Sequence, residues 1–478
     1  MRVAVVGLGF VGLTAALGFA EKGFQVAGYD IDENRSGQIR GGEVPFFEPG
    51  LNEALARTIG NRFIVTESAA AAVEHSECVF FCVGTPCGDD GKADLTHLLS
   101  AIHSVVREVS ADCVLVIKST IPPGTTANEI VPYLRAEGFQ GAIVVNPEFL
   151  REGKCWEDFM NPDRIVVGAE CADVSAEDAD ACAGTGARED DTADDPGGMP
   201  GAQYEINFDL HAHAIQTLTE MYAPFHAPLC FVSWSTAEFI KYMSNSLLAS
   251  LISFSNEMSL IAEAIGGVKV AEAFRILHQD RRLAGAGINS YIYPGCGYGG
   301  YCLPKDTVAL SAAAKGAGFT PRILDSVISL NDEMPRLAAE KIEAAARGHA
   351  TWRKALAKEN VNGIKGSGNR ETADKSTRIG ILGLSFKPES DDVRDSSAAK
   401  IIQCLLDDGY TEIYVHDPLA TEVFREHYGL PITYCMTAAQ VCEACNTVAI
   451  LTAWDVYRGI DKSFPGIHFV DCRYILAG

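Results

Sequence analysis

The sequence predicts an α/β protein in which two Rossmann-like α/β domains are joined by a long central helix and a helical middle domain. Three observations support this prediction. The first half alternates short β-rich runs with helical stretches, a helical pattern runs from about Ser235 to Ile265, and a new apolar strand pattern begins at Arg378. Strands that alternate with helices are typical of a parallel, doubly wound sheet.

The chain opens with a glycine-rich turn. An apolar strand, Val3 to Val6, runs directly into Gly7, Gly9 and Gly12. In a dinucleotide fingerprint of this spacing, the first glycine makes a tight turn, the second lets the pyrophosphate approach, and the third lets the helix pack closely. A second strand ends at Asp30, about 20 residues beyond the glycines, where the fold places the carboxylate that binds the adenosine ribose. Because an acid there repels a 2′-phosphate, the pattern favours NAD over NADP; the alternative is a turn without a ligand.

Three polar side chains come shortly after β-rich runs of the first half. They are Thr85, Thr120 and Glu148. In open parallel sheets, ligands bind beyond the carboxyl ends of the strands, so we expect these side chains to share one crevice. The β-rich runs after the first strand are Val26 to Tyr29, Cys78 to Val83, Val114 to Lys118 and Ile143 to Val145.

The predicted central helix carries Lys241 and Asn245. Residues at i and i+4 lie on one face of a helix, so both side chains can serve a single ligand. The alternative for Lys241 is a solvated helix lysine.

A glycine-rich loop from Gly295 to Asp306 carries Cys302 close to Lys305. Glycines let a backbone approach a ligand closely, and a nearby positive charge favours the thiolate, which is the form of cysteine that attacks carbon. The loop therefore predicts a nucleophilic cysteine. The alternative is that Cys302 is one of fifteen cysteines, most of them small buried hydrophobes.

With a nicotinamide site and a nucleophilic cysteine, the chain resembles the UDP-glucose/GDP-mannose dehydrogenase family. The resemblance extends over nearly the whole sequence. Besides the glycine-rich turn and the cysteine loop, it is carried by Val-Gly-Thr-Pro at 83–86, Lys-Ser-Thr-Ile-Pro-Pro-Gly at 118–124, Asn-Pro-Glu-Phe-Leu-Arg-Glu-Gly at 146–153, Glu-Phe-Ile-Lys-Tyr-Met-Ser-Asn at 238–245 and Gly-Leu-Ser-Phe-Lys-Pro-Glu-Ser-Asp-Asp-Val-Arg-Asp-Ser at 383–396.

The resemblance implies an NAD-dependent, four-electron oxidation of the C6 alcohol of a nucleotide sugar, through a thiohemiacetal and a thioester on the loop cysteine. The catalytic residues that it implies are Cys302, Lys241, Asn245, Asp306, Glu148 and Thr120. The implied cofactor-binding residues are Gly7, Gly9, Phe10, Val11, Gly12, Asp30, Thr85, Thr120, Glu152 and Lys305. The implied substrate-binding residues are Phe149, Leu150, Glu152, Lys241, Asn245, Arg282, Tyr291, Gly299, Phe386, Lys387 and Arg394.

Several of these residues have simpler alternatives. Glu148 follows a strand and could open a turn, and Glu152 could be a surface carboxylate or a charge at a helix N-terminus. Lys387 and Arg394 could form exposed salt bridges.

Within the family, the cysteine loop favours oxidation of UDP-glucose to UDP-glucuronate. Lys305 is present where the N-acetylhexosamine branch usually has a valine, and Tyr301 stands where that branch has a histidine. A UDP-N-acetylhexosamine or GDP-mannose dehydrogenase is the alternative. Two hypotheses from other classes are a single-hydride dehydrogenase, which would not need Cys302, and a non-catalytic nucleotide-sugar sensor.

Two segments of unusual composition divide the expected domains. Residues from about 170 to 202 are rich in Asp, Glu, Gly and Ala and predict an acidic surface insertion, and residues 346–376 predict a linker or insertion. The expected domains are an NAD-binding domain at 1–230, a central helical dimerisation and substrate domain with the cysteine loop at 231–345, and a C-terminal UDP-sugar-binding domain at 377–478.

The composition limits which partners the protein could bind and in which compartment we expect it. A length of 478 residues predicts several domains, and a net charge of −24 argues against nucleic acid or an anionic membrane as a partner. The cysteines show no disulfide-scaffold spacing and no apolar run is long enough to span a membrane, so we expect a cytoplasmic protein. No metal site is expected, because the CxxC of Cys442 and Cys445 has no second pair. The resemblance implies a homodimer or a higher homo-oligomer.

Overall fold

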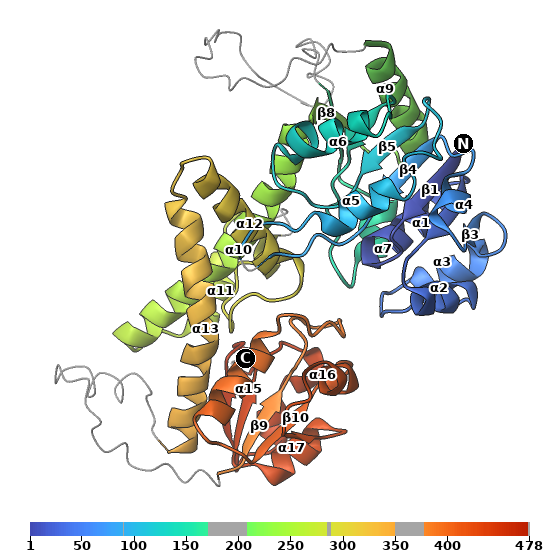
Figure 1. Ribbon diagram of the computed structural model, residues 1–478. Coiled ribbons are helices and arrows are strands. Elements are labelled where there is room, and N and C mark those ends of the chain that lie inside the picture. Colours follow the sequence, from blue (N-terminus) through green and yellow to red (C-terminus); the bar gives the residue numbers. More distant parts are fainter. Residues whose placement is uncertain (89, 171–207, 284–287, 349–376, 477–478) are drawn as a thin grey trace. The chain divides into compact units, whose positions relative to one another are not determined.

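The computed structural model describes residues 1–88, 90–170, 208–283, 288–348 and 377–476 (Figure 1). The chain divides into two compact units, Met1–Met243 and Ser244–Gly478. The first unit contains an eight-stranded sheet, and the second contains helices followed by a five-stranded sheet, which confirms the predicted fold class. The expected acidic insertion and linker lie almost entirely outside the described residues.

The first unit alternates strands with helices along the chain. Its strands are β1 (Arg2–Val6), β2 (Gln25–Tyr29), β3 (Phe63–Val65), β4 (Cys78–Phe81), β5 (Val114–Ile117), β6 (Ile143–Val145), β7 (Ile165–Ala169) and β8 (Leu229–Ser233). Its helices are α1 (Phe10–Glu21), α2 (Glu33–Arg40), α3 (Leu51–Thr58), α4 (Ala69–Val73), α5 (Thr96–His103), α6 (Val131–Ala136), α7 (Cys155–Met160) and α9 (Phe208–Tyr222). Helix α10 (Trp234–Ile265) runs from this unit into the second.

The strand order of the first sheet is β3-β2-β1-β4-β5-β6-β7-β8. Strands β1 to β6 pair in parallel, as the alternating pattern predicts. Strand β7, which lies beyond the last strand that the sequence predicted in this unit, pairs with β6 in the antiparallel sense. Asn146, the residue after β6, donates to the carbonyl of Val166 at 2.8 Å. The chain thus re-enters the sheet beside the carboxyl end of β6 and runs back along it.

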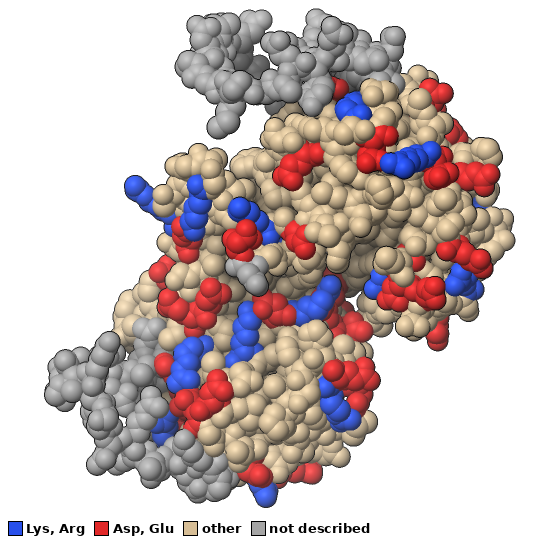
Figure 2. Space-filling model, in the orientation of Figure 1, with Lys and Arg blue, Asp and Glu red and all other residues tan. Residues whose placement is uncertain are grey.

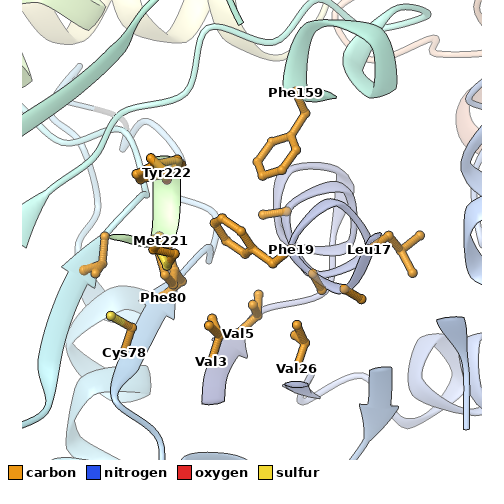
Figure 3. Packing of buried hydrophobic residues seen from close by; sticks show 14 of the residues in the cluster. Val3, Val5, Leu17, Phe19, Val26, Cys78, Phe80, Phe159, Met221 and Tyr222 are labelled. Carbon is orange, nitrogen blue, oxygen red and sulfur yellow. The ribbon is translucent and has the colours of Figure 1, made fainter. Parts of the chain in front are cut away.

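Helices cover both faces of this sheet and bury its apolar residues. Figure 3 shows Phe19 of α1 among Phe80, Phe159 and Tyr222, and the Phe19 and Phe80 ring centres are 5.0 Å apart. Helices α1, α3, α7 and α9 contribute to the core on this face, and α4, α5, α6 and the start of α10 contribute to the core on the other. The sheet is doubly wound, and its carboxyl edge holds the loops that carry the candidate residues.

The second unit begins with helices and ends in a second α/β domain. Its sheet is parallel, with the order β11-β10-β9-β12-β13. Its strands are β9 (Ile379–Leu382), β10 (Ile413–His416), β11 (Thr433–Tyr434), β12 (Thr447–Ile450) and β13 (His468–Asp471). Its helices after α10 are α11 (Val270–Leu277), α12 (Cys302–Gly316), α13 (Arg322–Ala346), α15 (Ser397–Asp407), α16 (Thr421–Tyr428), α17 (Ala438–Ala444) and α18 (Ile460–Ser463).

The two sheets start on the same kind of turn. Gly7 after β1 and Gly383 after β9 have φ values of +92° and +98°, which favour glycine. In each turn, the N–H of the next residue donates to an aspartate that follows the neighbouring strand, Asp30 at 2.6 Å in the first domain and Asp417 at 2.8 Å in the second. The C-terminal domain therefore repeats the nucleotide-binding architecture of the N-terminal domain.

The surface carries charges of both signs. On the face drawn in Figure 2, Lys and Arg side chains are interspersed with Asp and Glu side chains. Within the residues that the structure describes, none of the helices combines the length and the apolar character that a membrane crossing needs.

Candidate active site

The turn after β1 leaves room for a ligand at Gly9. A Cβ atom on Gly12 would lie 1.7 Å from the carbonyl oxygen of Gly7, so Gly12 is needed for the helix to pack against the turn. At Gly9, by contrast, an added Cβ would meet no heavy atom within 4 Å. This open space fits the role of a glycine that lets a pyrophosphate approach the backbone.

The groups around this space fit a dinucleotide. The N-cap of α1, Gly9, has no side chain to accept from the first N–H groups of the helix, which include those of Phe10 and Val11, and such groups bind phosphate. Asp30 follows β2, is buried and pairs with Arg35 at 3.0 Å. A carboxylate at this place suits the adenosine ribose of NAD. Arg35 was not predicted, although it lies only five residues beyond Asp30.

Alanine at Gly9 and at Gly12 should separate binding from folding. Gly12→Ala is expected to lower the free energy of unfolding by about 2 kcal/mol or more, because its methyl group overlaps backbone. Gly9→Ala should change it by less than about 1 kcal/mol, yet weaken NAD binding at least about tenfold, because the methyl group takes the space of the pyrophosphate. Urea unfolding and calorimetric titration with NAD measure the two effects. Equal losses of stability would contradict this account.

The loops after β4 and β5 are tied together by hydrogen bonds. Thr85 is buried, and its hydroxyl donates to the carbonyl of Thr120 at 2.6 Å. The hydroxyl of Ser119 donates to the carbonyl of Val83 at 2.7 Å. The structure thus brings Thr85 and Thr120 together at the carboxyl edge of the sheet.

Glu148 and Lys241 form a buried ion pair. Lys241 Nζ donates to Glu148 Oε1 at 2.8 Å, and the side chains are only 4% and 7% exposed, respectively. Burial alone would raise the pKa of Glu148, but the charge and hydrogen bond of Lys241, the N–H of Leu150 and the charge of Lys118 together outweigh burial, so the pKa lies below its usual value. The backbone N–H of Leu150 donates to the other carboxylate oxygen at 2.5 Å, and Lys241 Nζ lies 5.7 Å from the centre of the Phe149 ring. An ionised carboxylate held beside an ammonium can position or transfer a proton.

Glu48 holds the far end of the loop that carries Glu148 and Glu152. Its carboxylate accepts hydrogen bonds from the backbone N–H groups of Gly153 and Cys155, both at 2.7 Å. Glu152, the residue directly before Gly153, is half-buried. The contact with Gly153 joins residues 105 positions apart, so no local pattern could predict Glu48.

In the second unit, three polar side chains form a buried chain of hydrogen bonds. Asn245 Nδ2 donates to Asp306 Oδ2, and Lys305 Nζ donates to Asp306 Oδ1, both at 2.6 Å. All three side chains are buried. The two carboxylate oxygens of Asp306 therefore have one partner each, which fixes the amide of Asn245 on α10 against the first turns of α12.

Cys302 is the first residue of α12, and its side chain is exposed. The N-terminus of a helix carries partial positive charge, which favours a thiolate. Lys305, which the sequence suggested as the source of positive charge, is ion-paired with Asp306. The helix N-terminus is therefore a second source of positive charge near the thiol. The residue spacing in the sequence did not reveal it.

The cysteine loop contacts the 383–396 motif of the C-terminal domain. A Cβ on Gly299 would lie 2.4 Å from the carbonyl oxygen of Asp395, so only glycine allows this approach. The N–H of Gly300 donates to the carbonyl of Arg394 at 3.1 Å, and the Arg394 guanidinium lies 5.0 Å from the centre of the Tyr301 ring. These contacts place Arg394, a predicted substrate residue, beside the glycine-rich segment that contains Gly299 and leads into Cys302.

The remaining predicted substrate residues differ in their surroundings. Lys387 Nζ lies 5.3 Å from the centre of the Phe386 ring, and that ring is 3.1 Å from the Cβ position of Gly300. Arg282 is 87% exposed and pairs with Asp280 at 2.5 Å, which gives it no described contact with this cluster. Tyr291 is half-buried.

Asp392 holds Arg394 in place and was not predicted as a site residue. Its carboxylate accepts from the guanidinium at 2.7 to 3.0 Å. The motif Asp-Asp-Val-Arg could have indicated it, because an Asp two residues before an Arg can reach the guanidinium of that Arg.

Among the residues that the structure describes, no group of three or more His, Cys, Asp or Glu side chains could hold a metal ion.

Comparison with known proteins agrees with this arrangement. Family models of the UDP-glucose/GDP-mannose dehydrogenase family match the chain as the NAD binding domain at residues 1–180, the central domain at 235–333 and the UDP binding domain at 380–477.

Similar proteins align with almost the full chain. A UDP-glucose 6-dehydrogenase of Pseudomonas aeruginosa is 31% identical, with 96% of this chain and 89% of that protein covered. A UDP-glucose 6-dehydrogenase of Haloferax volcanii is 32% identical, with 98% and 94% covered. The solved structure of a UDP-glucose dehydrogenase from Pyrobaculum islandicum superposes with a TM-score of 0.78 at 33% identity, covering 99% of this chain and 94% of that one. The chain belongs to the UDP-glucose/GDP-mannose dehydrogenase family, whose N-terminal domain binds NAD.

Proposed function

We propose that this protein oxidises the C6 alcohol of UDP-glucose to UDP-glucuronate and uses two NAD molecules per sugar. The observation that carries this proposal is Cys302, exposed at the start of α12 directly before the buried Lys305–Asp306 pair. A thiol so placed can hold a half-oxidised substrate covalently, which a single-hydride dehydrogenase does not need. The names of the similar proteins and the Tyr301-Cys302 loop support UDP-glucose as the sugar.

The first oxidation converts the alcohol into an aldehyde. NAD, when bound, supplies the hydride acceptor for each of the two oxidations. The alcohol must also lose a proton, which passes to a water molecule, and Lys241, held by Glu148, is proposed to stabilise the negative charge that develops on the sugar oxygen. Asn245, one helical turn further along α10, and its partner Asp306 are proposed to orient the alcohol and this water.

The second oxidation takes place on Cys302. The thiolate adds to the aldehyde carbon to form a thiohemiacetal, which loses a hydride and a proton to become a thioester. Water then attacks the thioester and releases the acid and the thiol. Glu148 is proposed to activate or position this water, with Asp306 and Thr120 as orienting partners.

The nucleotide is proposed to lie against the C-terminal domain. Phe386, Lys387 and Arg394 offer an aromatic face and two cations for a uracil base and a diphosphate, and the family model over this region is that of a UDP binding domain. Gly299 lets the backbone of the cysteine loop come close to it. Phe149, Leu150 and Glu152 are proposed to contact the sugar end of the substrate from the loop after β6. Tyr291 and Arg282 are proposed to contact the sugar and the phosphate.

One assay tests the proposed function. Protein, NAD and UDP-glucose are mixed, the absorbance of reduced cofactor is followed, and the acid is quantified by chromatography. Two reduced cofactors per acid support the proposal, and one per sugar would support a single-hydride dehydrogenase. Parallel reactions with GDP-mannose and UDP-N-acetylhexosamines test the other sugars. Binding of UDP-glucose without reduction of NAD would support a nucleotide-sugar sensor.

A homodimer through α10 is also part of the proposal. Leu247, Phe254 and Ile261 follow one another at intervals of seven residues and are 53%, 50% and 44% exposed. Side chains at this spacing share one face of a helix, and an exposed apolar stripe is typical of an interface.

No disulfide joins the cysteines within the described ranges, which supports a reducing compartment such as the cytoplasm.

Charges on this stripe should dissociate the assembly. The double variant Leu247→Asp/Phe254→Asp is expected to behave as a monomer in size-exclusion chromatography with light scattering, because burying carboxylates in an apolar interface is strongly unfavourable. Val423→Asp, which changes an exposed apolar residue on α16, is the control and should keep the wild-type mass. A double variant with the wild-type mass, or a wild type that is already monomeric, would contradict an interface at this stripe.

A further inference from the structure

Among the residues that the structure describes, Lys118 is a buried lysine whose ammonium has no carboxylate within ion-pair distance. It follows β5 and is 5% exposed. Its ammonium donates to the side-chain oxygen of Asn146 at 2.9 Å and to the backbone carbonyl of Asn146 at 3.4 Å. Both acceptors are neutral, and burying an ammonium without an ion pair is costly. A charge kept in such a place is a candidate for function rather than for stability.

The strand ends fix Lys118 in place. Its backbone N–H donates to the carbonyl of Phe81 at 3.0 Å, and Asn146 N–H donates to the carbonyl of Ile117 at 2.9 Å. Lys118 therefore stands between the ends of β4 and β6. Asn146 is itself held, because Tyr222 Oη donates to its side-chain oxygen at 2.5 Å. The position of the ammonium is thus set by backbone and by a fixed amide.

Four titratable groups surround Lys118 in the buried cluster. Tyr222 of α9 donates to the same Asn146 oxygen as Lys118. Cys82 after β4, Glu148 two residues beyond Asn146, and Lys241 of α10 act on Lys118 through their electrostatic interactions. Burial raises the pKa of Cys82 to about 12 and raises the pKa of Tyr222 well above its usual value, so both stay neutral. The charges that remain belong to Glu148 and Lys241. Lys118 thus adds a second ammonium to that ion pair and makes the buried cluster cationic.

We propose that Lys118 is a positioning residue whose buried ammonium sets the protonation states of the Glu148–Lys241 pair. The proposal rests on the proposed function. A nearby cation favours the ionised form of Glu148, the form that can take a proton from water. The same cation lowers the pKa of Lys241, so its ammonium is a stronger hydrogen-bond donor to the negative charge that develops on the sugar oxygen.

The charge on Lys118 is itself pH-dependent. Burial, together with the like charge of Lys241, lowers the pKa of Lys118 to about 8, although the negative charge of Glu148 partly opposes this shift. Lys118 is therefore mostly charged below about pH 8 and mostly neutral above it.

The test compares wild type, Lys118→Met, Lys118→Arg and Cys82→Ala. The value of kcat/KM for UDP-glucose is measured with saturating NAD from about pH 5 to about pH 10. In Lys118→Met the acid limb of the profile, which reports Glu148 while Lys118 is charged, should move to higher pH by about one unit, because removing a cation raises the pKa of the carboxylate. Lys118→Arg keeps the charge and Cys82→Ala removes only a neutral neighbour, so both should leave the acid limb in place. A purely structural role would lower activity at every pH without moving the acid limb, and that result overturns the proposal.

Unfolding gives a second readout that does not need activity. The pKa of Lys118 is lower in the folded than in the unfolded state, so the unfolded chain binds more protons between about pH 8 and pH 10.5. The stability of wild type relative to Lys118→Met should therefore rise with pH across this window. A difference that does not change with pH overturns the proposal. A wild type that does not reduce NAD with UDP-glucose overturns the proposed function instead, and the unfolding readout still tests the charge of Lys118.

Discussion

Replacing Cys302 with alanine is expected to lower kcat for formation of UDP-glucuronate by about 10³-fold or more. Alanine cannot add to the aldehyde, so the second oxidation has no covalent intermediate. The side chain is exposed at the start of α12, and its removal leaves no buried cavity. We therefore expect the free energy of unfolding to change by less than about 0.5 kcal/mol. Steady-state measurement of acid formation and urea unfolding check the two statements.

A matched cysteine serves as the control for this variant. Cys404→Ala changes a half-buried cysteine on α15 and should keep the activity of the wild type. If Cys302→Ala still released two reduced cofactors per acid at the wild-type rate, Cys302 would not be the nucleophile.

Replacing Lys241 with methionine should damage both activity and stability. Its loss removes the group proposed to stabilise the sugar oxygen, so we expect kcat to fall about 10²- to 10³-fold. It also leaves Glu148 buried without its ion-pair partner, which costs about 3–5 kcal/mol of stability. Burial then acts on Glu148 with less opposition, so its pKa should rise. Kinetics and urea unfolding at neutral pH measure the two losses.

A double variant separates the two effects. In Lys241→Met/Glu148→Gln no buried charge of the pair remains, so most of the lost stability should return while activity stays low. The pKa of Glu148 is lower in the folded than in the unfolded state, so the stability contributed by its ionised form is present above about pH 5 and is lost as the pH falls. In Lys241→Met the pKa of Glu148 is raised by burial, so the penalty of its buried charge is lost as the carboxylate is protonated in acid. The advantage of Lys241→Met/Glu148→Gln over Lys241→Met should therefore shrink as the pH falls. If the double variant regained activity but not stability, the assigned role of Lys241 would be contradicted.

The strands were predictable because their residues are buried on both faces. Val114 to Ile117 and Ile143 to Val145 are continuous apolar runs in the sequence and are buried strands in the structure. The predicted run to Val83 was too long, because β4 ends at Phe81 and the carbonyl of Val83 accepts from Ser119 instead of joining the sheet. An apolar run in the sequence does not reveal at which residue the backbone stops pairing with the neighbouring strands.

The direction of β7 could not be predicted for a similar reason. It depends on Asn146 reaching Val166, a contact between side chain and backbone across 20 residues. Periodicity describes each segment by itself and carries no information about which edge of the sheet the chain returns to.

The candidate site was predictable where the chemistry is local. Gly7, Gly9 and Gly12 belong to one turn and the helix that follows it. Cys302 and Lys305 were predicted in one loop, and the structure places both in the first turn of α12. The pairs Glu148–Lys241 and Asn245–Asp306 join residues 93 and 61 positions apart, and only the resemblance to a family suggested that they act together. Lys118 lies within a recognised motif, but only its burial and its neutral partner show that it carries an unpaired charge.

The covalent bond between Cys302 and the sugar can be detected directly. The variant Glu148→Gln should hydrolyse the thioester slowly, so the intermediate should accumulate when the variant is mixed with UDP-glucose and NAD. After an acid quench, peptide mass spectrometry is expected to find a UDP-glucuronyl group on the peptide that contains Cys302 and on no other cysteine. An unmodified Cys302, together with aldehyde released after a single reduction of NAD, would contradict covalent catalysis by this residue.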